Sequence, residues 1–297
     1  MAVVRYKLLA IDLDGTLVDH HGHVSPANLR ALRAAREAGI MVVVCTGRAL
    51  IESMQVIRAI EQRDPVIVAG GAMVSCPDTG LTLERFALDQ SLTSDIVSHL
   101  TARGHAALVL KDPHAAGYDY LVVSERGIEA VDASSRWWFK NMGARLRCVA
   151  RLEDDEHPEH SVRIGAYAAN TPVDELAAEL RTRFGGVAML QHFSGVMLPA
   201  ERKLAGIESV HIVELFHAQA DKWQALDRLA MRLGIPRTET AAIGDQLNDL
   251  SMITHAGLGI AMGNGHERVK AAARRTTLSV DEDGVAHAIG MILEGAW

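Results

Sequence analysis

Near its start the chain contains the stretch Lys7-Leu8-Leu9-Ala10-Ile11-Asp12-Leu13-Asp14-Gly15-Thr16-Leu17-Val18. The apolar run up to Ile11 predicts a strand that is buried on both faces, and Gly15 breaks it. Asp12 and Asp14 would then lie where a central strand meets a loop, which is the edge of open α/β sheets where ligands bind. The alternative, a turn with a helix-capping aspartate, has about equal weight for this stretch alone.

Three later segments place a polar residue after an apolar run or at the start of a helical pattern. They are Met41-Val42-Val43-Val44-Cys45-Thr46-Gly47-Arg48, then Lys222-Trp223-Gln224-Ala225-Leu226, and finally Ala241-Ala242-Ile243-Gly244-Asp245-Gln246-Leu247-Asn248-Asp249. Taken singly, Thr46 could be a helix N-cap and Lys222 a solvated helix residue. Asp245 and Asp249 could equally be a loop residue and a cap, so the interpretation depends on all segments together.

Together the four segments resemble, in order, the four motifs of the haloacid dehalogenase-like superfamily, whose members are mostly phosphatases and phosphotransferases. This resemblance implies an α/β fold with a doubly wound, Rossmann-like parallel-sheet core. The segment Ala256–Gly265 and the sequence Asp283-Gly284-Val285-Ala286 further resemble the Cof-type, sugar-phosphatase-like branch, which carries a large type-two cap domain. The resemblance is close over about half of the chain, in the core.

The implied chemistry suits these residue types. A carboxylate nucleophile divides phosphate monoester hydrolysis into two easier steps through an aspartyl-phosphate, and Asp12 is the candidate. Asp14 is the candidate general acid, which then acts as the base that activates water. The resemblance assigns the binding of the phosphate group to four further residues, namely Thr46, Gly47, Lys222 and Asn248.

The expected cofactor is Mg²⁺, because a cation must neutralise the repulsion between a phosphate dianion and Asp12, and Mg²⁺ prefers hard oxygen ligands. By resemblance its ligands are Asp12, the backbone carbonyl of Asp14, and Asp245. Asp249 is expected to support the metal site from close by.

The outer thirds of the chain, 1–80 and 218–297, predict alternating strands and helices of one doubly wound catalytic core. The expected strands are 8–11, 42–45, 66–69, 241–243 and 258–262, and the expected helices are 25–39, 49–62, 222–233, 284–293 and two that start near 248 and 266. The middle, 81–217, predicts an inserted α+β cap domain. Its expected helices are 91–103, 126–141 and 172–183, and its expected strands are 106–111, 119–123, 145–149, 162–168, 187–191 and 210–215.

Composition sets further expectations. The chain has 297 residues and a net charge of −7, with no apolar stretch of membrane-spanning length and no signal peptide pattern. Three cysteines without a pairing motif suggest reduced thiols. We therefore expect a cytoplasmic protein that has no nucleic acid or membrane partner. The resemblance further implies that it acts on a small phosphorylated metabolite, and we expect a monomer or a homodimer.

The resemblance, with its cap domain, implies a phosphatase for sugar phosphates, phosphoglycolate-like acids or pyridoxal phosphate. One alternative is a phosphomutase or phosphotransferase with the same residues, and another is a non-catalytic, phosphate-binding regulator. Two departures from the branch concern substrate size and cap docking: Gly70-Gly71-Ala72 replaces Asn-Gly-Ala, and Trp223 replaces a glycine after Lys222. The indole could narrow the pocket or pack under the cap.

Four other features have a structural and a functional interpretation. The cluster His20, His21 and His23 suggests a transition-metal site, but a solvent-facing loop is favoured. The run 137–139, Trp-Trp-Phe, is expected in the cap core rather than in a substrate-stacking wall. The acidic run 153–156 is expected to be solvated. Arg202 and Lys203 could bind a second anionic group of the substrate, although loop charges are mostly solvated.

Overall fold

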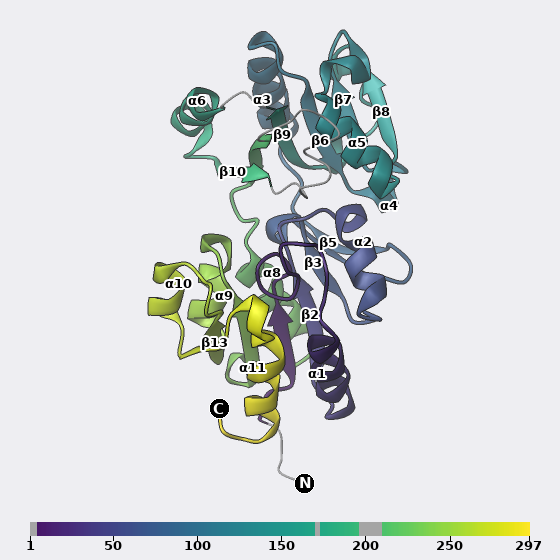
Figure 1. Ribbon diagram of the computed structural model, residues 1–297. Coiled ribbons are helices and arrows are strands. Elements are labelled where there is room, and N and C mark those ends of the chain that lie inside the picture. The colour runs from purple at the N-terminus through teal and green to yellow at the C-terminus, as the bar shows by residue number, and fades with distance from the viewer. Residues whose placement is uncertain (1–4, 170–172, 196–209) are drawn as a thin grey trace. The chain divides into compact units, whose positions relative to one another are not determined.

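The computed structural model describes residues 5–169, 173–195 and 210–297, so Arg202 and Lys203 lie outside the described residues (Figure 1). The chain divides into two compact units. One, the core unit, comprises Met1–Leu83 and Asp221–Trp297, and the other, the inserted unit, comprises Glu84–Ala220. Each unit contains its own β-sheet.

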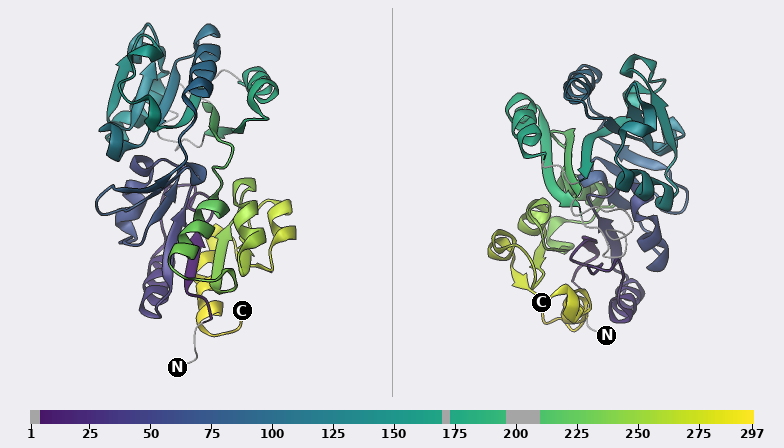
Figure 2. Two further views of the ribbon diagram at one scale, coloured as in Figure 1. Left: turned by 180° about the vertical axis from the view of Figure 1, so that it is seen from behind. Right: turned by 45° about the horizontal axis from the view of Figure 1, so that its top comes forward.

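The core unit is built on a sheet with the strand order β14-β13-β12-β1-β2-β3-β4-β5 (Figures 1 and 2). Its strands are β1 (Leu8–Ile11), β2 (Met41–Cys45), β3 (Val66–Val68), β4 (Met73–Ser75), β5 (Thr82–Arg85), β12 (Thr240–Gly244), β13 (Leu258–Ala261) and β14 (Arg275–Thr276). Strand β1 pairs in parallel with both β2 and β12, and all of its residues are buried. The predicted α/β class and parallel sheet are thus confirmed.

An antiparallel extension at one edge of this sheet was not predicted. Strand β4 runs antiparallel to β3, and β5 lies beyond it. The turn between β3 and β4 needs left-handed backbone at Gly70 (φ +65°) and Gly71 (φ +99°), which glycine adopts without steric cost. The three-residue strands on either side are too short to give a clear hydrophobic period.

The helices of the core unit begin and end close to their predicted limits. They are α1 (Pro26–Glu37), α2 (Leu50–Ala59), α8 (Lys222–Arg232), α9 (Leu250–His255), α10 (Glu267–Ala272) and α11 (Gly284–Leu293). Ser25 caps α1 by accepting from Asn28 N. Helix α2 ends before the predicted residue 62, because Glu61 is left-handed and the Gln62 side chain donates to Val42 O (2.6 Å).

The inserted unit has a sheet with the strand order β10-β11-β9-β6-β7-β8. Its strands are β6 (Ala107–Lys111), β7 (Tyr120–Val123), β8 (Leu146–Val149), β9 (Ser161–Ala169), β10 (Ala188–Gly195) and β11 (Val210–His217), and its helices are α3 (Gln90–Ala102), α4 (Pro113–Ala116), α5 (Ala133–Met142) and α6 (Asp174–Phe184). Leu121 belongs to the apolar cluster that α3 and α6 share, whereas the Tyr120 ring lies 4.9 Å from that of Phe139 on α5. Because neighbouring strand residues point to opposite faces, α5 covers the face opposite α3 and α6.

The predicted helix 126–141 was wrong in its first part. Helix α5 starts only at Ala133, because Asp132 Oδ1 accepts from Ser134 N and Ser135 N, both at 3.0 Å, and so caps the helix there. Of the aromatic run, Phe139 is in the core as expected, whereas Trp137 is 38% exposed.

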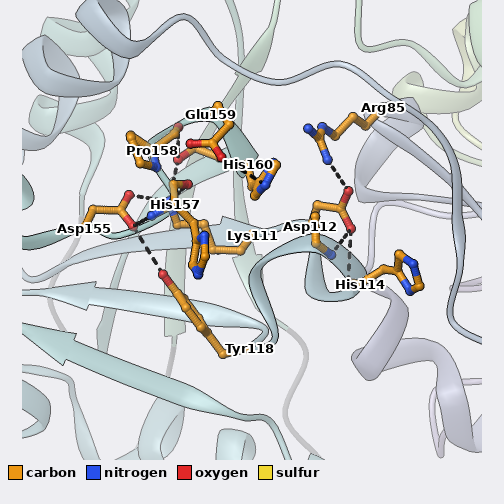
Figure 3. Close-up of polar contacts among 12 residues, drawn as sticks. Arg85, Lys111, Asp112, His114, Tyr118, Asp155, His157, Pro158, Glu159 and His160 are labelled. Carbon is orange, nitrogen blue, oxygen red and sulfur yellow. Dashed lines mark hydrogen bonds and ion pairs between the residues drawn. The ribbon is translucent and has the colours of Figure 1, made fainter.

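The acidic run 153–156 was expected to be solvated, and this is wrong for Asp155. Its carboxylate is buried and binds the ammonium of Lys111, which is also buried, and accepts from Tyr118 Oη at 3.2 Å (Figure 3). Burying an unpaired charge costs free energy, and the ammonium of Lys111 offsets this cost for the Asp155 carboxylate. The histidines at 20, 21 and 23 are exposed, and His20 Nε2 lies 3.1 Å from Asp281 Oδ1.

Gly71 offers a test of how α8 is positioned. A Cβ at Gly71 would lie 2.4 Å from the carbonyl carbon of Asp221, whereas a Cβ at Gly80 (φ +71°) would meet no described atom within 4 Å. We expect Gly80→Ala to cost about 1–2 kcal/mol of unfolding free energy from left-handed strain alone. Gly71→Ala should cost about 1–3 kcal/mol more because of the overlap. Chemical unfolding followed by circular dichroism measures both, and equal losses would show that the close approach to α8 is not a constraint.

Candidate active site

Parallel pairing gathers the predicted site residues at one edge of the core sheet. Ile11 is in register with Val44 of β2 and Ile243 of β12. The residues that follow these strands therefore share the carboxyl edge of the sheet, whose strands are seen in Figure 1. Asp12 and Asp245 are brought together there.

Lys222 is the first residue of α8 and points its ammonium into this edge. Its Nζ donates to Asp12 Oδ1 and to Asp249 Oδ1, each at 2.6 Å, and the side chain is 1% exposed. Asp221 fixes the start of the helix by accepting from the backbone N of Trp223 at 2.9 Å. The structure thus unites residues that lie more than 200 positions apart in the sequence.

The loop after β12 is held by Asp249. Its second oxygen, Oδ2, accepts from the backbone N of Asp245 and of Gln246, each at 3.0 Å. A Cβ at Gly244 would lie 2.6 Å from Asp249 Cβ, so only glycine leaves room for this carboxylate. Asp245 in turn accepts from Thr16 Oγ1 at 2.9 Å. Asp249 uses both oxygens within the protein, which makes it a positioning residue, and Thr16 is a contact that the sequence analysis missed.

Asp14 lies apart from these buried carboxylates. It is exposed, and Arg48 holds it with two hydrogen bonds, one from Nε to Asp14 Oδ2 at 2.8 Å and a second from Nη2 to Oδ1. Sequence analysis did not assign a role to Arg48, although it lies two residues after Thr46. The sequence signal that could have indicated this role is the positive charge of Arg48 in the loop after β2, the strand that pairs with β1.

The predicted phosphate-binding residues lie on two adjacent loops. Thr46 is buried and its Oγ1 accepts from Arg48 N at 3.1 Å, so the hydroxyl proton is available to another acceptor. A Cβ at Gly47 would come within 3.8 Å of Asn248 Nδ2, so these two residues are neighbours. Among the described residues, the buried Asn248 Oδ1 has no hydrogen-bond partner.

Burial and mutual repulsion raise the pKa values of the carboxyl groups. The pKa of Asp12 is raised well above its ordinary value by burial and by the charge of Asp249, against the attraction of Lys222. Burial and Asp249 likewise raise the pKa of Asp245 to about 6. Burial acts to lower the pKa of Lys222, but Asp12 and Asp249 outweigh it, so the pKa is raised and the ammonium stays charged.

The donor set fits a hard divalent cation. Asp12, Asp245 and Asp249 are buried, and each offers a carboxylate oxygen within 4.8 Å of the others. One ammonium cannot balance three carboxylates, and a buried surplus of negative charge favours a bound cation. An all-oxygen set of this kind suits Mg²⁺ better than metals that prefer nitrogen or sulfur.

The core unit has carboxylates and a lysine at the carboxyl edge of its sheet, and the chain also has an inserted α+β unit. This combination is the one expected from the resemblance to haloacid dehalogenase-like hydrolases. The chain belongs to the haloacid dehalogenase-like hydrolase family, whose model matches residues 9–289. It is 33% identical to the phosphatase YwpJ of Bacillus subtilis, over 97% of this chain and 100% of that protein. It is 30% identical to the 5-amino-6-(5-phospho-D-ribitylamino)uracil phosphatase YwtE of the same organism, over 98% of this chain and 99% of that one.

Solved structures agree with the sequence relatives. A haloacid dehalogenase-like hydrolase from B. subtilis matches with a TM-score of 0.73 and 31% identity, over 96% of this chain and 99% of that one. The chain is therefore a phosphatase of this family, in its Cof-type branch, as the sequence analysis expected. None of the described helices is both long and apolar enough to cross a membrane.

The two departures from the branch have structural explanations. The left-handed backbone at Gly70 is a conformation that asparagine, the usual residue there, also tolerates. Trp223 is 6% exposed in the apolar cluster of the core unit, where its ring stacks on His255 at 5.7 Å and lies under the Arg237 guanidinium. The indole therefore packs within the core unit, against His255 and Arg237.

Asp245 makes the stability of the metal-free protein depend on pH. Its folded-state pKa of about 6 lies above the ordinary 3.8, so between these values the folded chain binds more protons than the unfolded chain. The extra bound proton stabilises the folded state at low pH, and this stabilisation is lost as the pH rises through about 6. With chelator present, the unfolding free energy should fall by at least about 1 kcal/mol between about pH 5 and 7.5.

The matched variant is Asp245→Asn, which keeps an oxygen for Thr16 to donate to. Its unfolding free energy should fall less over the same pH range. An equal pH dependence in both proteins, measured by chemical unfolding, would show that Asp245 is not the source.

Proposed function

We propose that this phosphatase hydrolyses a small phosphomonoester through an aspartyl-phosphate on Asp12, with Mg²⁺ as cofactor. The observation that carries the proposal is the buried contact of Lys222 Nζ with Asp12 Oδ1, next to Asp245 and Asp249. A buried carboxylate beside a fixed cation, at the ligand-binding edge of the sheet, is placed to attack an anionic ester that the cation attracts.

Two steps follow from these residues. In the first, a carboxylate oxygen of Asp12 attacks phosphorus, the bond from phosphorus to the ester oxygen breaks, and Asp14 gives its proton to the leaving alcohol. In the second, Asp14 takes a proton from water, and the water oxygen attacks the phosphorus of the aspartyl-phosphate. This attack releases phosphate and regenerates the Asp12 carboxylate.

The protein's own groups hold the transferring phosphoryl group. Lys222 provides a fixed positive charge, while Thr46 and the loop of Gly47 and Asn248 provide hydrogen-bonding groups. Their preorganisation removes the cost of orienting donors during the reaction.

Asp12, the backbone carbonyl of Asp14, and Asp245 would hold Mg²⁺, with Asp249 fixing the loop. When bound, Mg²⁺ supplies positive charge that offsets the carboxylates and the phosphate. The raised pKa of Asp12 supports this assignment, because without further positive charge the carboxyl group is driven towards its protonated, non-nucleophilic form.

Arg48 is a positioning residue in this proposal. It binds Asp14 with two hydrogen bonds, which keeps that carboxylate exposed and out of the buried cluster.

The proposed partner is a small phosphorylated metabolite, such as a sugar or polyol phosphate. The printed name of the relative YwtE gives it a phosphorylated ribityl compound, whereas YwpJ is named a phosphatase without a stated substrate.

Asp12→Asn tests the nucleophile. We expect turnover to fall at least about a thousandfold, because the amide cannot form the covalent intermediate. The measurement is phosphate release from an aryl phosphate, sugar phosphates, pyridoxal phosphate and 5-amino-6-(5-phospho-D-ribitylamino)uracil, with Mg²⁺ and with chelator. Asp78→Asn, the same change in an exposed turn of the core unit, should keep full activity.

Three results would contradict parts of the proposal. Turnover that survives Asp12→Asn means that another group is the nucleophile. Activity that is unchanged by chelator removes the Mg²⁺ requirement. Phosphoryl transfer to a second sugar hydroxyl instead of water would identify a mutase.

Arg48→Met tests the positioning of Asp14. We expect kcat to fall about tenfold with little change in KM, because Asp14 loses its anchor while Lys222 still binds the phosphate. Arg48→Lys should recover only part of kcat, since an ammonium cannot form both hydrogen bonds. Steady-state kinetics on the best substrate measures this, and a pure KM effect would instead place Arg48 in substrate binding.

A further inference from the structure

A second group of metal-ligand side chains lies in the inserted unit. His157, Glu159 and His160 belong to the short turn that precedes β9, and each offers one ligand atom within 4.8 Å of the others. Figure 3 shows the three side chains next to one another beside the Lys111–Asp155 pair. All of these residues lie in the inserted unit, outside the site described above.

Buried polar contacts fix the backbone of this turn on both sides. At its start, His157 N donates to Asp155 Oδ1 and Lys111 Nζ donates to His157 O, each at 3.0 Å. At its end, Asp112 N donates to His160 O at 2.8 Å. Pro158 restricts the backbone between them. Because the turn is already ordered, ligand binding would require only side-chain rotations, which lowers its entropic cost.

The side chains have binding capacity that their protein contacts do not use. His160 Nδ1 is buried and has no hydrogen-bond partner among the described residues, which costs stability unless a ligand satisfies it. Its other nitrogen, Nε2, lies 3.1 Å from Glu159 Oε1. The rings of His157 and His160 are stacked with centroids 5.9 Å apart, so the two imidazoles are direct neighbours.

We propose that His157, Glu159 and His160 bind one transition-metal ion of the Zn²⁺, Co²⁺ or Ni²⁺ class. Two imidazoles and one carboxylate are a donor set that these metals favour, with water completing the coordination. The set differs from the all-oxygen cluster of Asp12 and Asp245, which suits Mg²⁺. The two sites therefore select different metals.

The metal would also stabilise the inserted unit. An ion that binds the folded turn and not the unfolded chain shifts the equilibrium towards the folded state by mass action. The turn adjoins the pair of Lys111 and Asp155 and the ring of Tyr118, which lies 6.0 Å from that of His157. Closing the turn with a metal would hold this buried polar cluster in place.

The test is a titration of the full chain with Co²⁺ in saturating Mg²⁺, which is added to fill the Mg²⁺ site of the proposed function. We expect one equivalent of Co²⁺ to give the visible absorption bands of a nitrogen-ligated ion. The dissociation constant should rise more than about tenfold in His157→Gln and in His160→Gln, a loss that removal of even an outer contact to a metal ligand can cause. Glu159→Gln, which alters an exposed side chain, should also weaken binding.

The control is the double variant His20→Gln, His21→Gln, which removes two exposed histidines of the core unit. It should bind Co²⁺ as the parent does, and circular dichroism in chelator should show that every variant is folded. The proposal is overturned if the parent shows no such bands, if His157→Gln and His160→Gln bind unchanged, or if the control loses binding. Failure of this titration would leave the Asp12 phosphatase assay unaffected.

Discussion

The ammonium of Lys222, buried between Asp12 and Asp249, is the contact on which the core unit depends. It joins the loop after the first strand, the start of α8 and the loop after β12 at 2.6 Å from each carboxylate. Breaking a buried ion pair by removal of one partner costs about 3–5 kcal/mol, since it leaves a charge without compensation. Gly71 and Gly244 allow these segments to approach, because a Cβ at Gly71 would overlap Asp221 and a Cβ at Gly244 would overlap Asp249.

Even with this contact, the cluster has more negative than positive charge. This imbalance affects both the free energy of unfolding and the binding of a cation. Burial raises the pKa values of Asp12 and Asp245, and the charge of Asp249, which one lysine does not offset, raises them further. A protein selected for stability alone would replace such a cluster with apolar side chains. Its retention fits a site that is completed by a cation and a phosphate ester.

Local patterns predicted much of the fold. Helix α11 has the predicted limits of 284–293, because a strong apolar period and an N-terminal glycine mark it. Strand β1 was readable from its continuous apolar run. The end of α2 and the start of α5 were not, since left-handed backbone at Glu61 follows α2 and the Asp132 side chain binds the first backbone N–H groups of α5.

The sequence by itself determined the fold class, the family and which residues follow the strands, because these depend on short-range periodicity and on motifs of adjacent residues. Only the tertiary structure decided that Arg48 holds Asp14, that Thr16 donates to Asp245, and that Lys111 takes Asp155 out of water. Each of these contacts joins segments whose separation in the chain carries no periodic signal. Their pairing is set by strand order and loop paths, which arise when the whole chain packs.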